Sequence, residues 1–169
     1  MHNHILDVVI LGAGYGGLGM AAVLKQHNIN NFKIFEKADT LGGVWRDNIY
    51  PGAACDTQSH IYCFSYFPHL RVSCMYAGQH ELLGYLDSLA THFELHPHLV
   101  YNAEIRQAIW SQTEQLWNLQ VTNIGTVKTK VFIPAWGQLN TPVMPHFKGE
   151  ERFLGPRFHS AAWQYDVDL

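Results

Sequence analysis

The first 36 residues carry the pattern that most constrains the fold. A short apolar run, Ile5–Leu11, precedes the glycine-rich stretch Gly12–Gly17, after which apolar residues recur at helical spacing to about His27. A second apolar run, Phe32–Glu36, ends on an acid. A short continuous apolar run is typical of a strand buried on both faces. The order therefore predicts strand, tight turn, helix and strand, which is the start of an α/β protein with a parallel sheet.

The glycines Gly12, Gly14 and Gly17 form the pattern G-x-G-x-x-G. In such a loop the first glycine permits the tight turn, the second lets the backbone approach a pyrophosphate, and the third lets the helix pack on the strand. The helix N-terminus offers free N–H groups and a positive dipole end to the phosphates. Glu36 lies 24 residues after Gly12, close to the roughly 20 expected for the acid that accepts both adenosine ribose hydroxyls. The pattern predicts a dinucleotide site, where the charge of Glu36 disfavours a 2′-phosphate; a glycine turn without a ligand is the alternative.

The rest of the chain predicts further elements around this unit. Residues 38–68 are rich in Gly, Pro, Tyr and Trp without periodicity, and a loop of this length is usually functional. Leucines at helical spacing predict a helix over Gln79–Phe93. Three strand-like pieces predict a three-stranded antiparallel meander: Val100–Trp110, Leu116–Val121 and Val127–Pro134. From residue 138 the prolines predict an irregular connector.

Composition excludes several functional classes. The length of 169 residues suits a single domain, and 47% hydrophobic residues exclude a disordered chain. A net charge of −3 offers no basic surface to nucleic acid or to an anionic membrane. Ile5–Leu24 carries one charge, but its five glycines and the absence of a basic leader argue against a membrane or export segment. We therefore expect no nucleic-acid partner and no membrane.

Cysteine and histidine usage indicates neither a disulfide framework nor a metal site. The three cysteines are an odd number without a C-x-x-C pair, which indicates a reducing, cytoplasmic location. His92, His96 and His98 cluster near the end of the predicted helix, but no carboxylate or thiol completes a ligand set there. We expect no metal.

Motifs after Glu36 resemble those of a known family. The segment reads Lys37-Ala-Asp-Thr-Leu-Gly-Gly43-Val44-Trp45, then Tyr50-Pro-Gly and Cys55-Asp56. Further on, Ala135-Trp-Gly137 and the run Phe153–Trp163 follow, the latter with the spacing F-x-G-x-x-x-H-[ST]-x-x-W. Over essentially the whole chain these motifs resemble the class B flavoprotein monooxygenases, and within them the Baeyer–Villiger group.

The resemblance implies a fold, a cofactor and an activity. The fold would be a Rossmann-type FAD-binding domain, with residues 1–138 as its N-terminal part and 139–169 as a connector carrying the fingerprint and leading to an NADPH domain absent from the sequence. In that family NADPH reduces FAD, and the reduced flavin uses O₂ to insert oxygen into a ketone. NADPH is thus expected only in the intact enzyme, and the 169 residues are expected to be inactive alone. A non-catalytic FAD or nucleotide-binding module and an inert relict are the alternatives.

The resemblance also implies site residues and a partner. Asp56 would be the active-site aspartate beside the flavin, holding an arginine that this sequence lacks. A complementing chain or self-association is expected, with exposed apolar surface at Trp136, Trp163 and Tyr62–Phe67. Trp136, where a small residue is usual, is expected to crowd the dinucleotide. The expected FAD contacts are Gly12, Gly14, Tyr15, Gly16, Gly17, Glu36, Lys37, Gly43, Val44, Trp45, Cys55, Asp56, Tyr62, Ile105 and Gly137.

Overall fold

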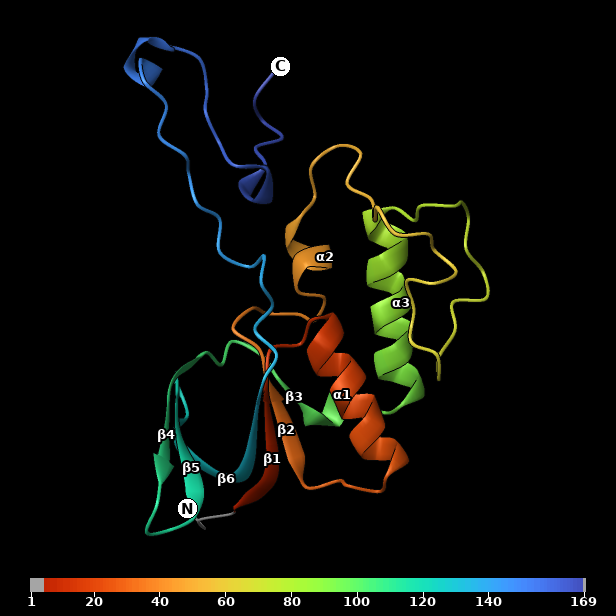
Figure 1. Cartoon of the computed structure of the whole chain (residues 1–169), viewed down its shortest axis with the longest axis vertical. Coiled ribbons are helices and arrows are strands. Elements are labelled where there is room, and N and C mark those ends of the chain that lie inside the picture. The colour runs from red at the N-terminus through yellow and green to blue at the C-terminus, as the bar shows by residue number, and fades with distance from the viewer. Residues whose placement is uncertain (1–4, 169) are drawn as a thin grey trace.

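The computed structural model describes residues 5–168, which form one mixed sheet with helices on one side of it (Figure 1). The six strands lie in the order β3-β2-β1-β6-β5-β4. Their bounds are β1 Leu6–Leu11, β2 Phe32–Phe35, β3 Leu99–Val100, β4 Ile105–Ser111, β5 Leu116–Val121 and β6 Gly125–Pro134. The helices are α1 Tyr15–Gln26, α2 Val44–Asp47 and α3 Gln79–His92, with 3₁₀ turns η1 His96–His98, η2 Glu150–Arg152 and η3 Ser160–Ala162.

Residues 5–36 fold into the strand, helix and strand that the sequence predicts. β1 and β2 lie parallel, with Val8 opposite Phe32 and Leu11 opposite Phe35, and α1 connects them. Alternate residues of a strand point to opposite faces of a sheet, and here both faces are covered. On one face, strand residues pack with α1 and α3: Val8, Ile10, Phe32 and Ile34. On the other face, strand residues pack with the antiparallel strands: Leu6, Val9 and Phe35.

β6 joins the parallel and antiparallel parts of the sheet. Its first half pairs antiparallel with β5, and its second half runs parallel to β1. Thr129 lies where the two pairings meet, opposite both Trp117 and Leu6, and it is fully buried. Between β5 and β6 the chain turns through Asn123 and Gly125, which have φ angles of 63° and 95°. The predicted meander of β4, β5 and β6 is thus confirmed, and it continues the parallel sheet edge to edge.

The single strand predicted over Val100–Trp110 is wrong. The chain instead forms β3, which pairs with β2 at one edge of the sheet, and β4, which pairs with β5 at the other. Asn102 lies between them with a φ of 53°, and the N–H of Ala103 donates to the carbonyl of Glu36 at 2.9 Å. An asparagine tolerates this left-handed conformation, which turns the chain. β-Propensity reports that residues suit a strand, but not which strand they pair with.

The long segment between β2 and α3 is tied down by a few contacts. It contains α2, and aromatic residues of the segment pack against the hydrophobic core between the sheet and the helices α1 and α3, including Phe64, Tyr66 and Phe67. The predicted helix is confirmed as α3, with Leu82, Leu86 and Leu89 fully buried. The expectation that Tyr62–Phe67 forms exposed apolar surface is wrong for its aromatic rings, because they are partly buried against the core.

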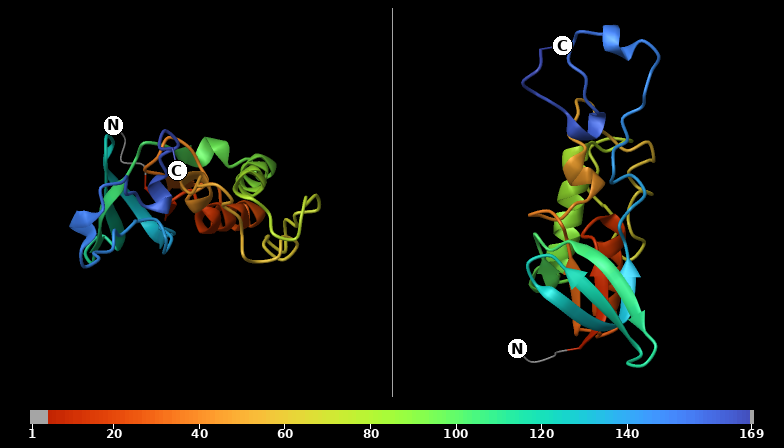
Figure 2. Two further views of the ribbon diagram at one scale, coloured as in Figure 1. Left: turned by 90° about the horizontal axis from the view of Figure 1, so that it is seen from above. Right: turned by 90° about the vertical axis from the view of Figure 1, so that its left-hand side faces the viewer.

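Residues 135–168 leave the sheet after β6 and extend beyond the carboxyl ends of the parallel strands (Figure 2). Most of this tail is exposed and irregular, as its prolines predict. Its end returns towards α2, where the hydroxyl of Tyr165 donates to the carbonyl of Ile49.

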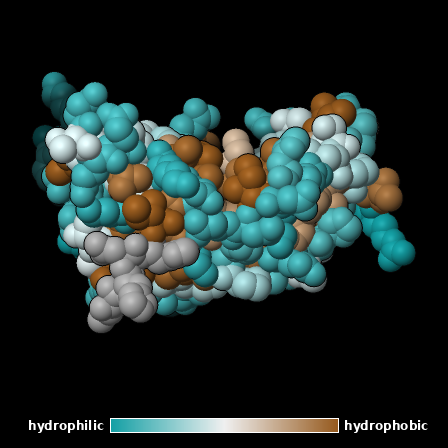
Figure 3. Space-filling view, turned by 90° about the horizontal axis from the view of Figure 1, so that it is seen from below, coloured by the Kyte–Doolittle hydropathy of each residue, from teal (hydrophilic) through white to brown (hydrophobic). Residues whose placement is uncertain are grey.

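The opposite face, at the amino ends of the parallel strands, shows scattered hydrophobic patches between hydrophilic side chains (Figure 3). Within residues 5–168, none of the helices has the length and apolar character needed to cross a bilayer.

Candidate functional site: a cleft over two glycine segments

The first glycine segment turns the chain directly from β1 into α1. Gly12 has a φ of 96°, and its N–H donates to the carbonyl of Phe35 at 2.8 Å. A Cβ at Gly17 would lie 1.9 Å from the carbonyl oxygen of Gly12, so only a glycine lets the helix sit this close to the strand. These two glycines serve the fold itself: one permits the turn and the other permits the packing.

Gly14 and Gly16 are different, because the fold does not require them. Gly14 has an ordinary φ of −85°, and a Cβ there would make an ordinary contact with the backbone of Gly43, whose Cα would be nearest at 3.5 Å. A Cβ at Gly16 would meet the side chain of Ala135 at 3.9 Å, also an ordinary contact. Both residues nevertheless line an open cleft. The missing side chains therefore leave free space in the cleft rather than relieve strain in the chain.

The N-terminus of α1 carries unpaired backbone donors beside this cleft. The first N–H of the helix with an intrahelical partner is that of Leu18, which donates to the carbonyl of Gly14 at 3.0 Å. For the N–H groups of residues 15–17 no acceptor exists within residues 5–168. Three free N–H groups at the positive end of a helix dipole favour an anion.

A second glycine segment packs directly on the first. The N–H of Gly42 donates to the carbonyl of Ala13 at 2.9 Å. Gly42 and Gly43 have φ angles of 123° and 55°, and a Cβ at Gly43 would lie 2.9 Å from the Cα of Gly14. Two segments nearly 30 residues apart in sequence thus form one continuous backbone floor.

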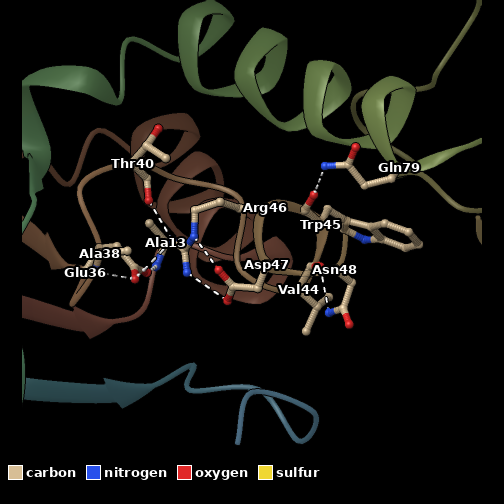
Figure 4. A network of polar contacts seen from close by, with 10 residues as sticks. All are labelled: Ala13, Glu36, Ala38, Thr40, Val44, Trp45, Arg46, Asp47, Asn48 and Gln79. Atoms are coloured by element: carbon tan, nitrogen blue, oxygen red, sulfur yellow. Dashed lines mark hydrogen bonds and ion pairs between the residues drawn. The ribbon is translucent and has the colours of Figure 1, made fainter. Parts of the chain in front are cut away.

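Glu36 lies at the polar end of this floor and is 4% exposed. Its Oε2 accepts from the N–H of Ala13 at 2.8 Å, and its Oε1 accepts from the N–H of Ala38 at 3.0 Å. Nη1 of Arg46 lies 3.2 Å from the same Oε1 (Figure 4). The carboxylate therefore ties the first glycine segment to the chain after β2, a role that its spacing from Gly12 did not reveal.

Arg46 extends from α2 to two carboxylates. Its Nε and Nη2 donate to Asp47 at 2.7 and 2.9 Å, and its Nη1 donates to the carbonyl of Thr40 at 2.7 Å. Burial acts to lower the pKa of Arg46, but Asp47 and Glu36 raise it by more, so the net shift is upward. The guanidinium is a permanent cation at the end of the cleft.

The cleft over the two segments has a volume of about 540 Å³ and opens at the carboxyl ends of β1, β2 and β6. This is the edge of a parallel sheet where nucleotides bind in doubly wound folds. The structure brings eleven of the predicted contacts together there: Gly12, Gly14, Tyr15, Gly16, Glu36, Lys37, Gly43, Val44, Tyr62, Ile105 and Gly137.

Four predicted residues lie outside the cleft lining. Gly17 packs under the loop, as described above. Nε1 of Trp45 donates to the hydroxyl of Tyr62 at 3.2 Å, and its side chain packs against the buried cluster that contains Cys55. Cys55 is buried against Ala77 and Leu82. Asp56 is exposed and is not among the residues that line the cleft.

The cleft also contains residues that the motifs did not single out. Arg46, Asp47 and Glu104 supply its charges beyond Glu36 and Lys37. Trp136 also lines the cleft, and 60% of its surface is exposed. An Arg-Asp pair shortly after a double glycine is a signal that could have pointed to Arg46. Its partner Glu36 is ten residues earlier and becomes apparent only in the fold.

Aromatic rings close one side of the cleft. Tyr15 and Tyr62 have ring centroids 5.0 Å apart, and Tyr15 also contacts Phe64 at 4.6 Å. Burial raises the pKa of Tyr15 and of Tyr62, so both phenols stay neutral around pH 7. This wall supplies apolar surface without charge.

The three clustered histidines have separate neighbours. His96 contacts the hydroxyl of Thr91 at 3.2 Å, and Nδ1 of His98 lies 3.0 Å from the carbonyl of Phe32. His92 packs on Phe67. In the described part of the chain, no group of three or more His, Cys, Asp or Glu side chains could hold a metal ion.

Comparison with known proteins agrees with this geometry. Residues 10–77 match the family model described as an NAD(P)-binding Rossmann-like domain. A Baeyer–Villiger monooxygenase of Streptomyces coelicolor is 38% identical over 169 residues, which are 100% of this chain and 32% of that protein. An FAD-binding monooxygenase of Hypomyces subiculosus, hmp7, is 36% identical over 166 residues, which are 95% of this chain and 27% of that protein.

Solved structures match the fold over nearly the whole chain. An open crystal structure of cyclohexanone monooxygenase superposes with a TM-score of 0.86 at 33% identity, covering 98% of this chain and 33% of that one. A crystal structure of OTEMO in complex with FAD and NADP superposes with a TM-score of 0.82 at 32% identity, covering 96% and 31%. The predicted Rossmann-type fold is confirmed, and the chain spans about a third of the length of the relatives it matches.

Proposed function

Because the chain is homologous over its whole length to the N-terminal third of Baeyer–Villiger monooxygenases, we propose that it is the N-terminal part of an FAD-binding domain. The enzyme that this domain serves is proposed to be an NADPH-dependent flavin monooxygenase that inserts oxygen into ketones. Residues 139–169 are proposed to be the connector towards the NADPH domain of that enzyme.

The contact between the two glycine segments is the main observation that supports FAD binding. A mononucleotide loop needs only the first segment, whereas here the backbone at Gly43 packs on Gly14 and extends the floor. Gly14 and Gly16 leave space that a Cβ would fill, and the unpaired N–H groups of Tyr15 and Gly16 belong to residues that line the same cleft. The residues present therefore fit an extended dinucleotide with a pyrophosphate at its centre.

Each part of the cleft has a distinct task in this proposal. The N–H groups at the start of α1 hold the pyrophosphate, and Glu36 binds the adenosine ribose. Tyr15 and Tyr62 exclude water from one side of the cleft. When bound, FAD supplies the redox chemistry, and the protein positions and shields it.

We also propose that the protein associates with a complementing chain or with itself, and that it is located in the cytoplasm. The exposed apolar side chains of the tail support a complementing chain or self-association: Trp136, Leu139, Val143, Phe147 and Leu154. The three cysteines are free thiols, which supports a reducing, cytoplasmic location.

Equilibrium dialysis of the 169-residue protein against FAD tests the binding proposal. We expect saturable binding of one FAD per chain, with an altered visible absorption spectrum of the bound flavin. An absence of saturable binding by a folded protein would overturn it.

NADPH oxidation with added FAD tests the proposed division of labour. The sequence has one glycine-rich phosphate loop, and in this proposal FAD occupies it. We therefore expect the protein to oxidise NADPH no faster than free FAD does. A rate clearly above that of free FAD would assign hydride transfer to these 169 residues.

A further inference from the structure

The side chain of Arg46 belongs to the charged end of the cleft, where the ribose is proposed to bind, and is not needed to join the two glycine segments. The hydrogen bond from the N–H of Gly42 to the carbonyl of Ala13 already joins the two glycine segments, and it does not involve the guanidinium. Arg46, Asp47 and Glu36 all line the cleft. A change in the Arg46 side chain therefore alters the charged end of the cleft and leaves the backbone floor in place.

The guanidinium has a fixed orientation. Asp47 accepts from Nε and Nη2 in a bidentate pair, at 2.7 and 2.9 Å, and the carbonyl of Thr40 accepts from Nη1. The side chain of Arg46 is 14% exposed. Bidentate pairing sets the plane of a guanidinium as well as its position. Nη1 is thereby directed at Oε1 of Glu36 (Figure 4).

Glu36 has little unused acceptor capacity. An ionised carboxylate offers about four acceptor positions, and the N–H groups of Ala13 and Ala38 and the guanidinium of Arg46 occupy three of them. About one position remains for a ribose hydroxyl. Arg46 supplies the charged contact among the three, since Ala13 and Ala38 donate from the main chain.

We propose that Arg46, oriented by Asp47, is a positioning residue that holds Glu36 for recognition of a hydroxyl of the adenosine ribose. This inference rests on the proposed function and adds the residue that determines ribose selectivity. Without the guanidinium, Glu36 and Asp47 lose the cation that they share. The carboxylate of Glu36 is then held by the two main-chain N–H groups alone. In this proposal the protein no longer prefers a ribose with hydroxyls over one with hydrogen in their place.

Two ligands that differ only in the hydroxyls test this inference. ADP and 2′,3′-dideoxyadenosine 5′-diphosphate carry the same adenine and pyrophosphate, so the ratio of their dissociation constants reports on the ribose alone. We expect the parent protein to prefer ADP about tenfold or more, which is the value of one hydrogen bond to a charged group. Titration followed by NMR chemical shifts measures both constants.

Arg46→Met is expected to reduce this preference to below about threefold. Arg46→Lys is expected to restore part of it, because lysine keeps the charge but not the bidentate geometry. Arg152→Met is the matched control, since Arg152 is an exposed arginine in the tail that pairs with Glu151, and we expect it to keep the parent ratio. If Arg46→Met does not fold, Asp47→Asn is the second test of the inference. It releases the guanidinium without removing it, and we expect it to lower the preference for ADP over the dideoxy analogue as well.

The outcomes separate this inference from the proposed function. If the folded parent binds neither ligand, the proposed nucleotide site is wrong and the inference falls with it. If the parent binds ADP but Arg46→Met weakens both ligands equally, the ratio is unchanged and Arg46 has only a structural role. A lowered ratio in Arg46→Met, with the parent ratio in Arg152→Met, supports the inference.

Discussion

At the scale of single residues, Gly14 and Gly17 lie three positions apart, yet the fold needs a glycine at only one of them. A Cβ at Gly17 would overlap the carbonyl oxygen of Gly12, whereas a Cβ at Gly14 has room. The sequence motif contains both glycines and does not separate these roles. The distinction between a glycine kept for packing and one kept for a ligand comes from the neighbouring backbone.

Alanine substitutions at these positions are expected to act on different properties. Gly17→Ala should lower the free energy of unfolding by about 3 kcal/mol or more, as a strongly overpacked site does. Gly14→Ala should change stability by less than about 1 kcal/mol, while weakening FAD binding by more than about tenfold, because its Cβ occupies the space of the pyrophosphate.

Gly84→Ala is the control for both substitutions. Gly84 lies on the exposed side of α3, and a Cβ added there would have no atom within 4 Å. We therefore expect about 0.5–1 kcal/mol of added stability and unchanged FAD binding. Urea denaturation and equilibrium dialysis measure the two properties. Strong FAD binding by Gly14→Ala would place the pyrophosphate elsewhere.

Tyr66 makes stability depend on pH in the alkaline range. Burial raises its pKa from 10.0 to about 12, and Tyr85 adds to the shift. Below pH 10 the phenol is protonated in both states. Between about pH 10 and 12 it ionises in the unfolded chain but not in the folded one, so the free energy of unfolding falls as pH rises.

Tyr66→Phe should make this alkaline fall less steep. It should also cost about 1 kcal/mol at pH 8, because the hydroxyl of Tyr66 donates to the carbonyl of Gly19 at 2.9 Å. Urea denaturation at several pH values from 8 to 11.5 measures both effects, with Tyr76→Phe as the control for an exposed tyrosine. The same slope in Tyr66→Phe and in the parent would contradict the assignment.

At the scale of elements, Ser59 holds the long segment between β2 and α3 in place. Its hydroxyl lies 2.8 and 3.0 Å from the carbonyls of Cys74 and Met75 and accepts from the N–H of Ala77 at 2.8 Å. Ser59 is 1% exposed. A loop without periodicity gives no sequence signal for such an anchor, because its contacts join residues 15–18 positions apart.

Ser59→Ala is expected to destabilise the protein by about 1–3 kcal/mol, since it leaves buried backbone groups without a partner. Amide hydrogen exchange should show the loss within residues 53–78 before it reaches β1. The exposed Ser65 provides the control through Ser65→Ala. Uniform exchange across the sheet would show that Ser59 does not act on this segment locally.

At the scale of the whole molecule, apolar side chains of the tail are left in solvent. Phe147 is 67% exposed and Leu154 is 96% exposed. Exposed apolar patches above a few hundred Å² mark interaction or aggregation sites. The tail is therefore the surface through which we expect association.

Sedimentation velocity should show concentration-dependent association of the parent protein. The double variant Phe147→Ser and Leu154→Ser should reduce both the association and the binding of an apolar dye. Leu70→Ser, which removes an 85% exposed leucine outside the tail, should change neither. A sharp monomer at all concentrations, with no dye binding, would favour a self-contained binding module instead.

Local sequence patterns were enough to predict several parts of this protein. Apolar runs and helical spacing predicted β1, α1, β2 and α3, because burial of a face requires a fixed period along the chain. The glycine spacing predicted the turn after β1, because backbone conformation at each position limits the residue that fits. Glu36 was located by its position at the end of β2.

The contacts between these parts became apparent only in the folded chain. The fold divided residues 100–110 between opposite edges of the sheet, packed Gly43 on Gly14, and placed Arg46 beside Glu36. It also placed Asp56 outside the cleft lining, despite a sequence motif that implies a place beside the flavin. The physical reason is the same in each case. A local pattern determines which residues of a helix or strand face the core, whereas chain reversals elsewhere determine which distant residues they contact.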